Sequence, residues 1–181
     1  MPRRWILTAL GKDRPGIVAG VTQVLYDRGC NLEDSAMTRL GGEFAIMLAF
    51  AAPSGLSAQA LRHAVEPLER RLRLAVHLKS LSAAEALAPR AAGRRYLISV
   101  YGADRPGIVF RISDALARKG INITDLHTHR SPRGRTPLYL TLLEAELPRG
   151  GSEAGFSRHL RQVAKRIGAQ VSLRPADPDV L

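Results

Sequence analysis

The sequence predicts an α+β protein of two similar domains, each a four-stranded antiparallel sheet with two helices on one face. Three observations lead to this prediction. The chain of 181 residues is long enough for two small domains, its halves repeat one another, and each half alternates strand-like and helix-like periodicity in the order βαββαβ. Hydrophobic residues make up 45% of the chain and charged residues 24%, as in globular proteins, so each domain can bury a core.

The repeat is visible directly in the sequence. Residues 5–39 align without gaps on residues 96–130, with 12 of 35 positions identical where composition alone would give roughly two. A period this long is that of a small domain, so we interpret the chain as a duplicated domain. Its predicted parts are domains over residues 1–82 and 94–175, an alanine-rich linker over 83–93 and a tail over 176–181.

The elements of the first copy begin with a strand over residues 4–10, followed by a helix with Pro15 in its first turn. Gly29 ends that helix. A hairpin over residues 31–51 then turns at Gly41-Gly42.

A second helix and a final strand complete the copy. Ser57 can cap the helix, Pro67 is expected to kink or end it, and alternating apolar residues from Leu72 to Leu78 predict the strand. The second copy repeats the pattern over 95–101, 106–119, 121–131, 137–147, 152–167 and 170–174. Each copy is therefore a ferredoxin-like βαββαβ fold.

The charge of the chain is strongly basic. Lysine and arginine number 27 against 16 acidic residues, a net charge of +11, which is the first feature sought in a nucleic-acid-binding protein. Most of these cations are arginines, as expected for a protein encoded by a GC-rich genome. The sequence contains neither an RNP-like cluster of aromatic residues nor a helix-turn-helix pattern. We therefore predict no direct nucleic-acid binding, and a basic RNA-binding βαββαβ protein is kept as an alternative.

Several other classes of protein are disfavoured. No apolar run approaches the roughly 20 residues of a membrane helix, and the single cysteine, Cys30, permits no internal disulfide, so we expect a soluble cytoplasmic protein without membrane contact. Nucleophile elbow, Walker loop, HExxH and dinucleotide motifs are absent from the sequence. We predict no catalytic residues, no cofactor and no metal; His127 and His129 share a strand face without a third ligand.

One motif carries the functional prediction. Gly-x-Asp-Arg-Pro-Gly-Ile-Val occurs twice, from Gly11 and from Gly102, each time between the first strand and the first helix. Its aspartate can cap the helix or hold a cation, and its second glycine leaves the helix N–H groups open to an anion such as a carboxylate. Asn31 and Asn122 begin the next strand of each copy, and we expect them to share one end of the sheet with the loop.

With this motif and the strand beginning Gly-x-Asn, the sequence resembles a tandem pair of ACT domains, small regulatory modules that sense amino acids beside metabolic enzymes. Residues 30–44 of the first copy are similar to the glycine cleavage system transcriptional repressor family. The resemblance implies that Asp13 with Asn31, and Asp104 with Asn122, contact an amino-acid ligand.

The predicted function is that of a non-catalytic regulatory protein that binds a small amino acid at the two loops. It relays occupancy to a protein partner, a regulator or metabolic enzyme, in the transcriptional control of amino-acid metabolism, and we expect a homo-oligomer. The candidate ligand-binding residues are Gly11, Asp13, Arg14, Pro15, Gly16, Ile17 and Asn31, with Gly102, Asp104, Arg105, Pro106, Gly107, Ile108 and Asn122 in the second copy.

A purely structural interpretation stands beside this one. The aspartates can be helix caps alone, the asparagines can be turn residues, and Arg14 and Arg105 are expected to point to solvent or to an interface. On that interpretation the protein is an assembly scaffold without a ligand.

Overall fold

The chain forms two compact units in a computed structural model, which describes residues 2–86, 93–131, 137–148, 150 and 152–176. The units are Met1–Ala88 and Pro89–Leu181, and the division between them falls within the predicted linker. The structure describes a one-turn helix in that linker, α3 (Ala83–Ala86). Residues 87–92 of the predicted linker and residues 177–181 of the predicted tail lie outside the described residues.

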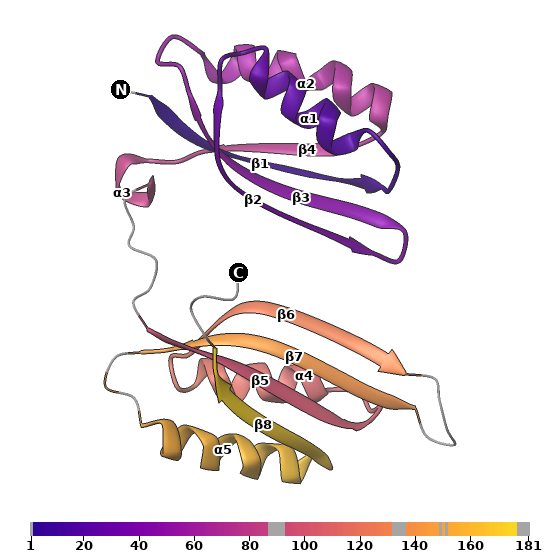
Figure 1. Ribbon diagram of the computed structural model, residues 1–181, viewed down its shortest axis with the longest axis vertical. Helices are drawn as coiled ribbons and strands as arrows, with labels where there is room; N and C mark the ends of the chain where they lie inside the picture. The colour runs from indigo at the N-terminus through magenta and orange to yellow at the C-terminus, as the bar shows by residue number, and fades with distance from the viewer. Residues whose placement is uncertain (1, 87–92, 132–136, 149, 151, 177–181) are drawn as a thin grey trace. The chain divides into compact units, whose positions relative to one another are not determined.

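The first unit has the predicted order of elements. They are β1 (Arg3–Lys12), α1 (Ile17–Tyr26), β2 (Asn31–Leu40), β3 (Glu43–Ala52), α2 (Ala58–Leu72) and β4 (Ala75–Ser80). The strands form one antiparallel sheet in the order β2-β3-β1-β4, with both helices on the same face (Figure 1). The predicted α+β fold class is confirmed.

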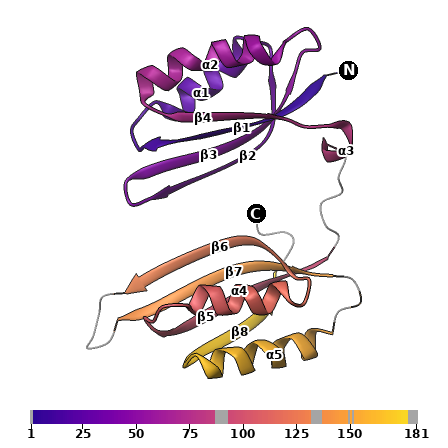
Figure 2. The same cartoon turned by 180° about the vertical axis from the view of Figure 1, so that it is seen from behind.

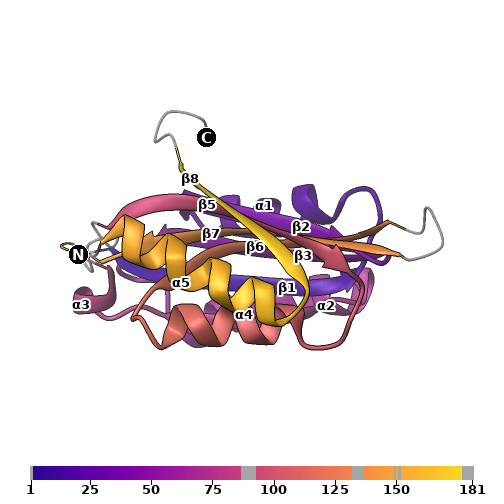
Figure 3. The ribbon, with the colours of Figure 1, turned by 90° about the horizontal axis from the view of Figure 1, so that it is seen from below.

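The second unit repeats this fold. Its elements are β5 (Arg94–Ala103), α4 (Ile108–Ala117), β6 (Asn122–Ser131), β7 (Leu138–Leu147), α5 (Glu153–Arg166) and β8 (Ala169–Pro175). The sheet order is β6-β7-β5-β8, the same arrangement as in the first unit. Helices α4 and α5 lie side by side on one face of this sheet (Figures 2 and 3).

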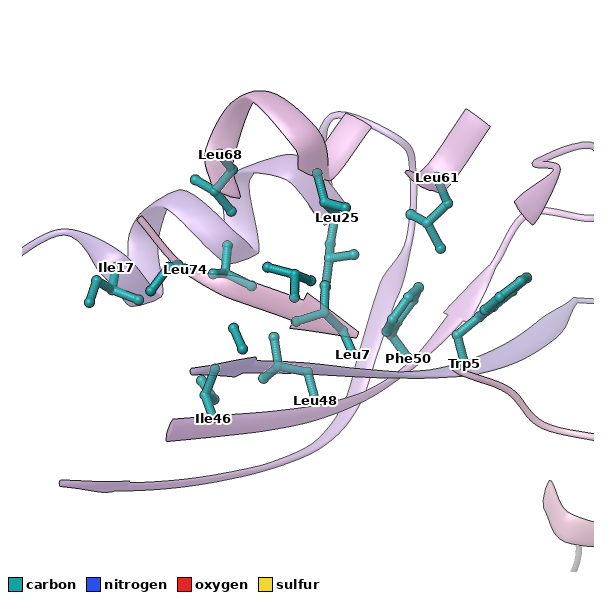
Figure 4. Packing of buried hydrophobic residues seen from close by; sticks show 14 of the residues in the cluster. Trp5, Leu7, Ile17, Leu25, Ile46, Leu48, Phe50, Leu61, Leu68 and Leu74 are labelled. Atoms are coloured by element: carbon teal, nitrogen blue, oxygen red, sulfur yellow. The ribbon is translucent and has the colours of Figure 1, made fainter. Parts of the chain in front are cut away.

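The core of the first unit lies between its sheet and its two helices (Figure 4). Successive side chains of a strand point to opposite faces, so Trp5 and Leu7 of β1 and Leu48 and Phe50 of β3 all point toward the helices. Leu61 of α2 meets them from above, fully buried. This alternation holds α1 and α2 against the sheet, and thereby fixes where the loop before α1 lies.

Two details of α2 differ from the prediction. The helix continues through Pro67 to Leu72, so the proline neither ends it nor marks its boundary, and Leu72 belongs to the helix rather than to the last strand. The reason is burial: Val65 and Leu68 on either side of the proline are part of the core, and their burial outweighs the one backbone hydrogen bond that proline cannot donate.

The strand at one edge of each sheet is largely exposed. Every residue of β2 is exposed, and the residues of β6 are exposed or half-buried, whereas β1, β3, β5 and β7 bury alternate side chains. β2 and β6 each pair with only one neighbouring strand in their own sheet, so their outer edges carry backbone groups able to pair with another strand.

The alternation of β3 predicts the effect of two neighbouring substitutions. Leu48 is 1% exposed in the core, and Leu48→Ala is expected to lower the free energy of unfolding of the first unit by about 2–5 kcal/mol. Met47, on the other face of the sheet, is 52% exposed. Met47→Ala should therefore change the free energy of unfolding by less than about 1 kcal/mol. Trp5, the single tryptophan, lies in this core, so its fluorescence during urea unfolding reports on this unit. Equal effects of the two substitutions would contradict this assignment.

Candidate functional site

The turn from the first strand into the first helix depends on a glycine in each unit. Gly16 (φ 90°, ψ −4°) and Gly107 (φ 91°, ψ 3°) have the left-handed backbone conformation of the third residue of a type II turn, with proline in the preferred second position. Pro15 therefore precedes the helix, which begins at Ile17, and is not in its first turn as predicted. A Cβ on Gly16 would meet nothing within 4 Å, so the space beside this turn is open.

The helices α1 and α4 begin without a side-chain cap. Gly16 and Gly107 are the N-cap residues. Among the described residues no side chain makes a capping hydrogen bond to either helix, and neither helix has an acidic residue in its first turn. The first N–H groups of an α-helix have no acceptor within the helix and carry the positive end of its dipole. These two helix ends can therefore accept an anion.

The aspartates of the motif hold a cation and do not cap the helix. The Asp13 carboxylate pairs with the Arg39 guanidinium at 3.1 Å, and the Asp104 carboxylate pairs with that of Arg130 at 2.6 Å. The backbone N–H of Asp13 also donates to the Gly42 carbonyl at 2.9 Å. Each loop is thus held against the hairpin of its own unit, by the backbone and by an ion pair.

The other motif residues have structural surroundings. A Cβ on Gly11 would lie 2.8 Å from Leu74 Cδ2 and 2.9 Å from the Arg73 carbonyl oxygen, so glycine is needed here because the chain before β4 comes close. A Cβ on Gly102 would likewise lie 3.1 Å from the Cα of Ala169.

The motif arginines and isoleucines also contact their own unit. Arg14 is exposed, and its guanidinium donates to the carbonyl of Leu72 at the end of α2. Arg105 reaches the corresponding place in the second unit, where a Cβ on Gly168 would lie 3.6 Å from its Nη1. Ile17 and Ile108 are buried in the two cores.

Asn31 and Asn122 lie far from the loops of their own units, contrary to the expectation that each pair shares one end of the sheet. β1 and β2 run in the same direction with β3 between them. The start of β2 and the end of β1 therefore lie at different ends of the sheet (Figure 1). Asn31 is level with Arg4, and about eight residues of strand, roughly 26 Å, separate that level from the loop. Asn122 is level with Arg95 in the same way.

A surface hollow of about 490 Å³ lies at the loop of the second unit. It is lined by residues 104–110 and by Tyr139 of β7. Tyr139 is the cross-strand partner of both Gly102 and Arg130, which places Arg130 on the strand beside the hollow. Phe110 is 70% exposed and adds an apolar wall. Carboxylate, aromatic rings and free helix N–H groups therefore meet at one place.

The sequence prediction missed the two arginines that pair with the aspartates. Arg39 and Arg130 are one of the 12 identical pairs of the repeat, so a signal was present in the sequence. Only the strand register shows that they lie near the loop. Arg39 is the cross-strand partner of Phe44, and Phe44 is in turn the cross-strand partner of Gly11. Two residues far apart in the chain thus reach the same end of the sheet.

Other candidate residues have ordinary explanations. Burial raises the pKa of the Cys30 thiol above its usual value, although the positive charge of Arg28 opposes this, and the side chain packs against the core. His127 pairs with Asp125 at 3.1 Å. Among the described residues, no group of three or more His, Cys, Asp or Glu side chains could hold a metal ion. None of the described helices is long and apolar enough to cross a membrane.

Comparison with known proteins identifies both units. Residues 3–79 and residues 96–149 each match the ACT domain family. The chain is similar to the glycine cleavage system transcriptional repressor of Escherichia coli strain K12, with 28% identity over 171 residues that cover 93% of this chain and 87% of that protein.

Solved structures show the same fold over the whole chain. The crystal structure of a protein from Galdieria sulphuraria has a TM-score of 0.81 and 24% identity, covering 98% of this chain and all of that one. A structure named for the glycine cleavage system transcriptional repressor has a TM-score of 0.72 and 19% identity, covering 98% of this chain and 99% of that one.

The left-handed turn predicts a stability difference between two glycines of the first unit. Gly16→Ala should lower the free energy of unfolding by about 1–2 kcal/mol, because alanine resists a positive φ even where its Cβ has room. Gly55 has equal room and no positive φ, so Gly55→Ala should leave the stability unchanged or raise it slightly. Urea unfolding followed by Trp5 fluorescence measures both, and an unchanged midpoint for Gly16→Ala would contradict the turn assignment.

Proposed function

Because the chain belongs to the ACT-domain family, with two ACT domains in tandem, we propose that it is a regulatory protein that binds a small amino acid at its strand–helix loops. The observation that carries the proposal is the same in both units. An uncapped helix N-terminus lies beside an aspartate that is held by an arginine. A free amino acid needs one partner for its carboxylate and another for its ammonium group, and this arrangement offers both.

The two charges of the ligand have different partners in this proposal. The carboxylate meets the N–H groups that follow Gly16 or Gly107, where the helix dipole favours negative charge. The ammonium group meets the carboxylate of Asp13 or Asp104. The hollow beside the second loop is large enough for a small amino acid, and Tyr139 and Phe110 give it an aromatic lining.

The relative from Escherichia coli is named as a transcriptional repressor of the glycine cleavage system, which makes glycine the first ligand to test. We propose that occupancy of the loops is passed to a protein partner, a regulator or a metabolic enzyme, which acts on the target. The protein itself has no catalytic role in this proposal, and it works in the cytoplasm.

A second copy of the chain can bring the asparagines to the loops. Antiparallel pairing of the exposed edge of β2 with β2 of another copy, about a two-fold axis, sets the start of one strand beside the end of the other. Asn31 of one copy then lies near the Asp13–Arg39 pair of the second copy. We propose that the asparagines complete the site in this way, in a homo-oligomer.

The aspartates provide the direct test of ligand binding. In calorimetric titration of the full chain with glycine, L-alanine and L-serine, at least one should bind, and Asp13→Asn/Asp104→Asn should weaken that binding about tenfold or more, since hydrogen bonds to a charged partner contribute about 1.5–3 kcal/mol. Asp114→Asn is the matched control, because Asp114 also pairs with an arginine, Arg118, but on the exposed side of α4. Binding of none of the three amino acids below millimolar concentration would favour the scaffold function instead.

The asparagines test the role of a second copy. Asn31→Ala/Asn122→Ala should weaken amino-acid binding by about 1–3 kcal/mol while leaving each fold intact, because both side chains are exposed at the ends of edge strands. Sedimentation velocity, run beside the titration at a series of protein concentrations, should show that the wild type binds the amino acid tightly only where it self-associates. Equal affinity in a monomer would exclude the second copy from the site.

A further inference from the structure

We infer that Arg130, with Arg39 in the first unit, determines ligand specificity by binding the carboxylate of the ligand together with the helix N-terminus. This inference rests on the proposed function and names the chemical class that the site selects: a zwitterion with adjacent ammonium and carboxylate groups. Neither arginine belongs to the repeated Gly-x-Asp-Arg-Pro-Gly motif. Both are brought to the loop only by the register of the hairpin.

The geometry of the Asp104–Arg130 pair leaves donors free. Arg130 uses Nε for its contact with Asp104 Oδ2, and among the described residues its terminal amino groups have no other ion-pair partner. A guanidinium group has five N–H donors in a fixed plane, and its two terminal groups fit the two oxygens of a carboxylate. The Asp104 side chain likewise keeps a second oxygen for an ammonium group.

A zwitterion can therefore bind without breaking the pair. Its ammonium group beside Asp104 and its carboxylate beside Arg130 would give a ring of four charges that alternate in sign. A free carboxylic acid would gain the arginine but lie beside the aspartate, and an amine or an amino-acid amide would gain the aspartate but lie beside the arginine. Each of these ligands loses one attractive contact and leaves one charge of the Asp104–Arg130 pair without an opposite charge in the ligand, so the site favours the zwitterion over both.

The surroundings of Arg130 support this role. Tyr139, its cross-strand partner, lines the hollow together with Asp104, so the strand that carries Arg130 runs beside the hollow wall. The Arg130 side chain is 65% exposed and its Asp104 partner 31% exposed, so a ligand can reach both charged groups. A pair that served stability alone would contribute little at this exposure.

The duplication gives independent support. Only 12 of the 35 aligned positions remained identical between the two copies, and both members of this ion pair are among them. In the first unit the pair is Asp13–Arg39 at 3.1 Å, with the arginine using Nη1 in place of Nε. The contact has thus been kept in both units although the atom that makes it differs, which fits a requirement for the two charges.

The test compares acids with their amides. Glycine, L-alanine and L-serine, and the three corresponding amino-acid amides, are titrated into the full-length wild type and into Arg39→Gln/Arg130→Gln. The wild type should prefer the acid over its amide by about tenfold or more, and the double variant should bind the acid about tenfold more weakly and lose that preference. Arg39→Lys/Arg130→Lys should retain part of the preference, because lysine keeps the charge without the planar pair of donors.

Lys79→Gln/Arg118→Gln is the matched control, since it removes two exposed ion-paired cations, one from each unit, away from both loops. It should bind as the wild type does, and circular dichroism should show every variant folded. Loss of binding in Asp13→Asn/Asp104→Asn, with normal binding and normal acid preference in the arginine-to-glutamine variant, would overturn this inference and leave the proposed function standing. A wild type that binds none of the three amino acids would overturn both.

Discussion

The left-handed backbone at Gly16 and Gly107 is the constraint on which each unit depends. It turns the chain sharply from a central strand into a helix, and that helix then has its apolar side against the sheet it has just left. Because the turn places glycine at the N-cap position, the N-cap residue has no side chain with which to cap the helix. The first N–H groups of the helix therefore lack a side-chain acceptor among the described residues, and a structural requirement of the fold leaves this helix end able to accept an anion.

The two units have kept this junction but differ in what surrounds it. Phe44 opposes Gly11 in the first unit and is buried, whereas Tyr139 opposes Gly102 in the second and lines a hollow. Two residues further along the same strand, Ile46 of the first unit corresponds to Thr141 of the second. The buried hydroxyl of Thr141 has no hydrogen-bond partner among the described residues. At these two positions of the sheet the second unit is thus more polar than the first.

The open edges of the sheets and the loops are linked by topology. In the strand order β2-β3-β1-β4, the edge strand and the strand before the loop run in the same direction, so the end of β2 approaches the loop and its start does not. The arginine at the end of the edge strand meets the aspartate within one unit. The asparagine at its start lies at the other end of the sheet, and in the proposed homo-oligomer the exposed edge of β2 pairs with another copy and brings this asparagine to that copy's loop.

The sequence by itself determined the fold class, the duplication and the loops that carry the motif, because patterns within short stretches of sequence indicate each of them. Period-two and helical apolar spacing define the elements, and Pro-Gly before an apolar stripe marks the start of a helix. It could not determine that Pro67 lies within a continuous helix, since that depends on the burial of Val65 and Leu68 against strands far away in the chain. Only the tertiary structure decided which residues meet the aspartates. Whether Asn31 or Arg39 lies beside Asp13 depends on a strand, β3, inserted between β1 and β2, and on the register that it imposes on both.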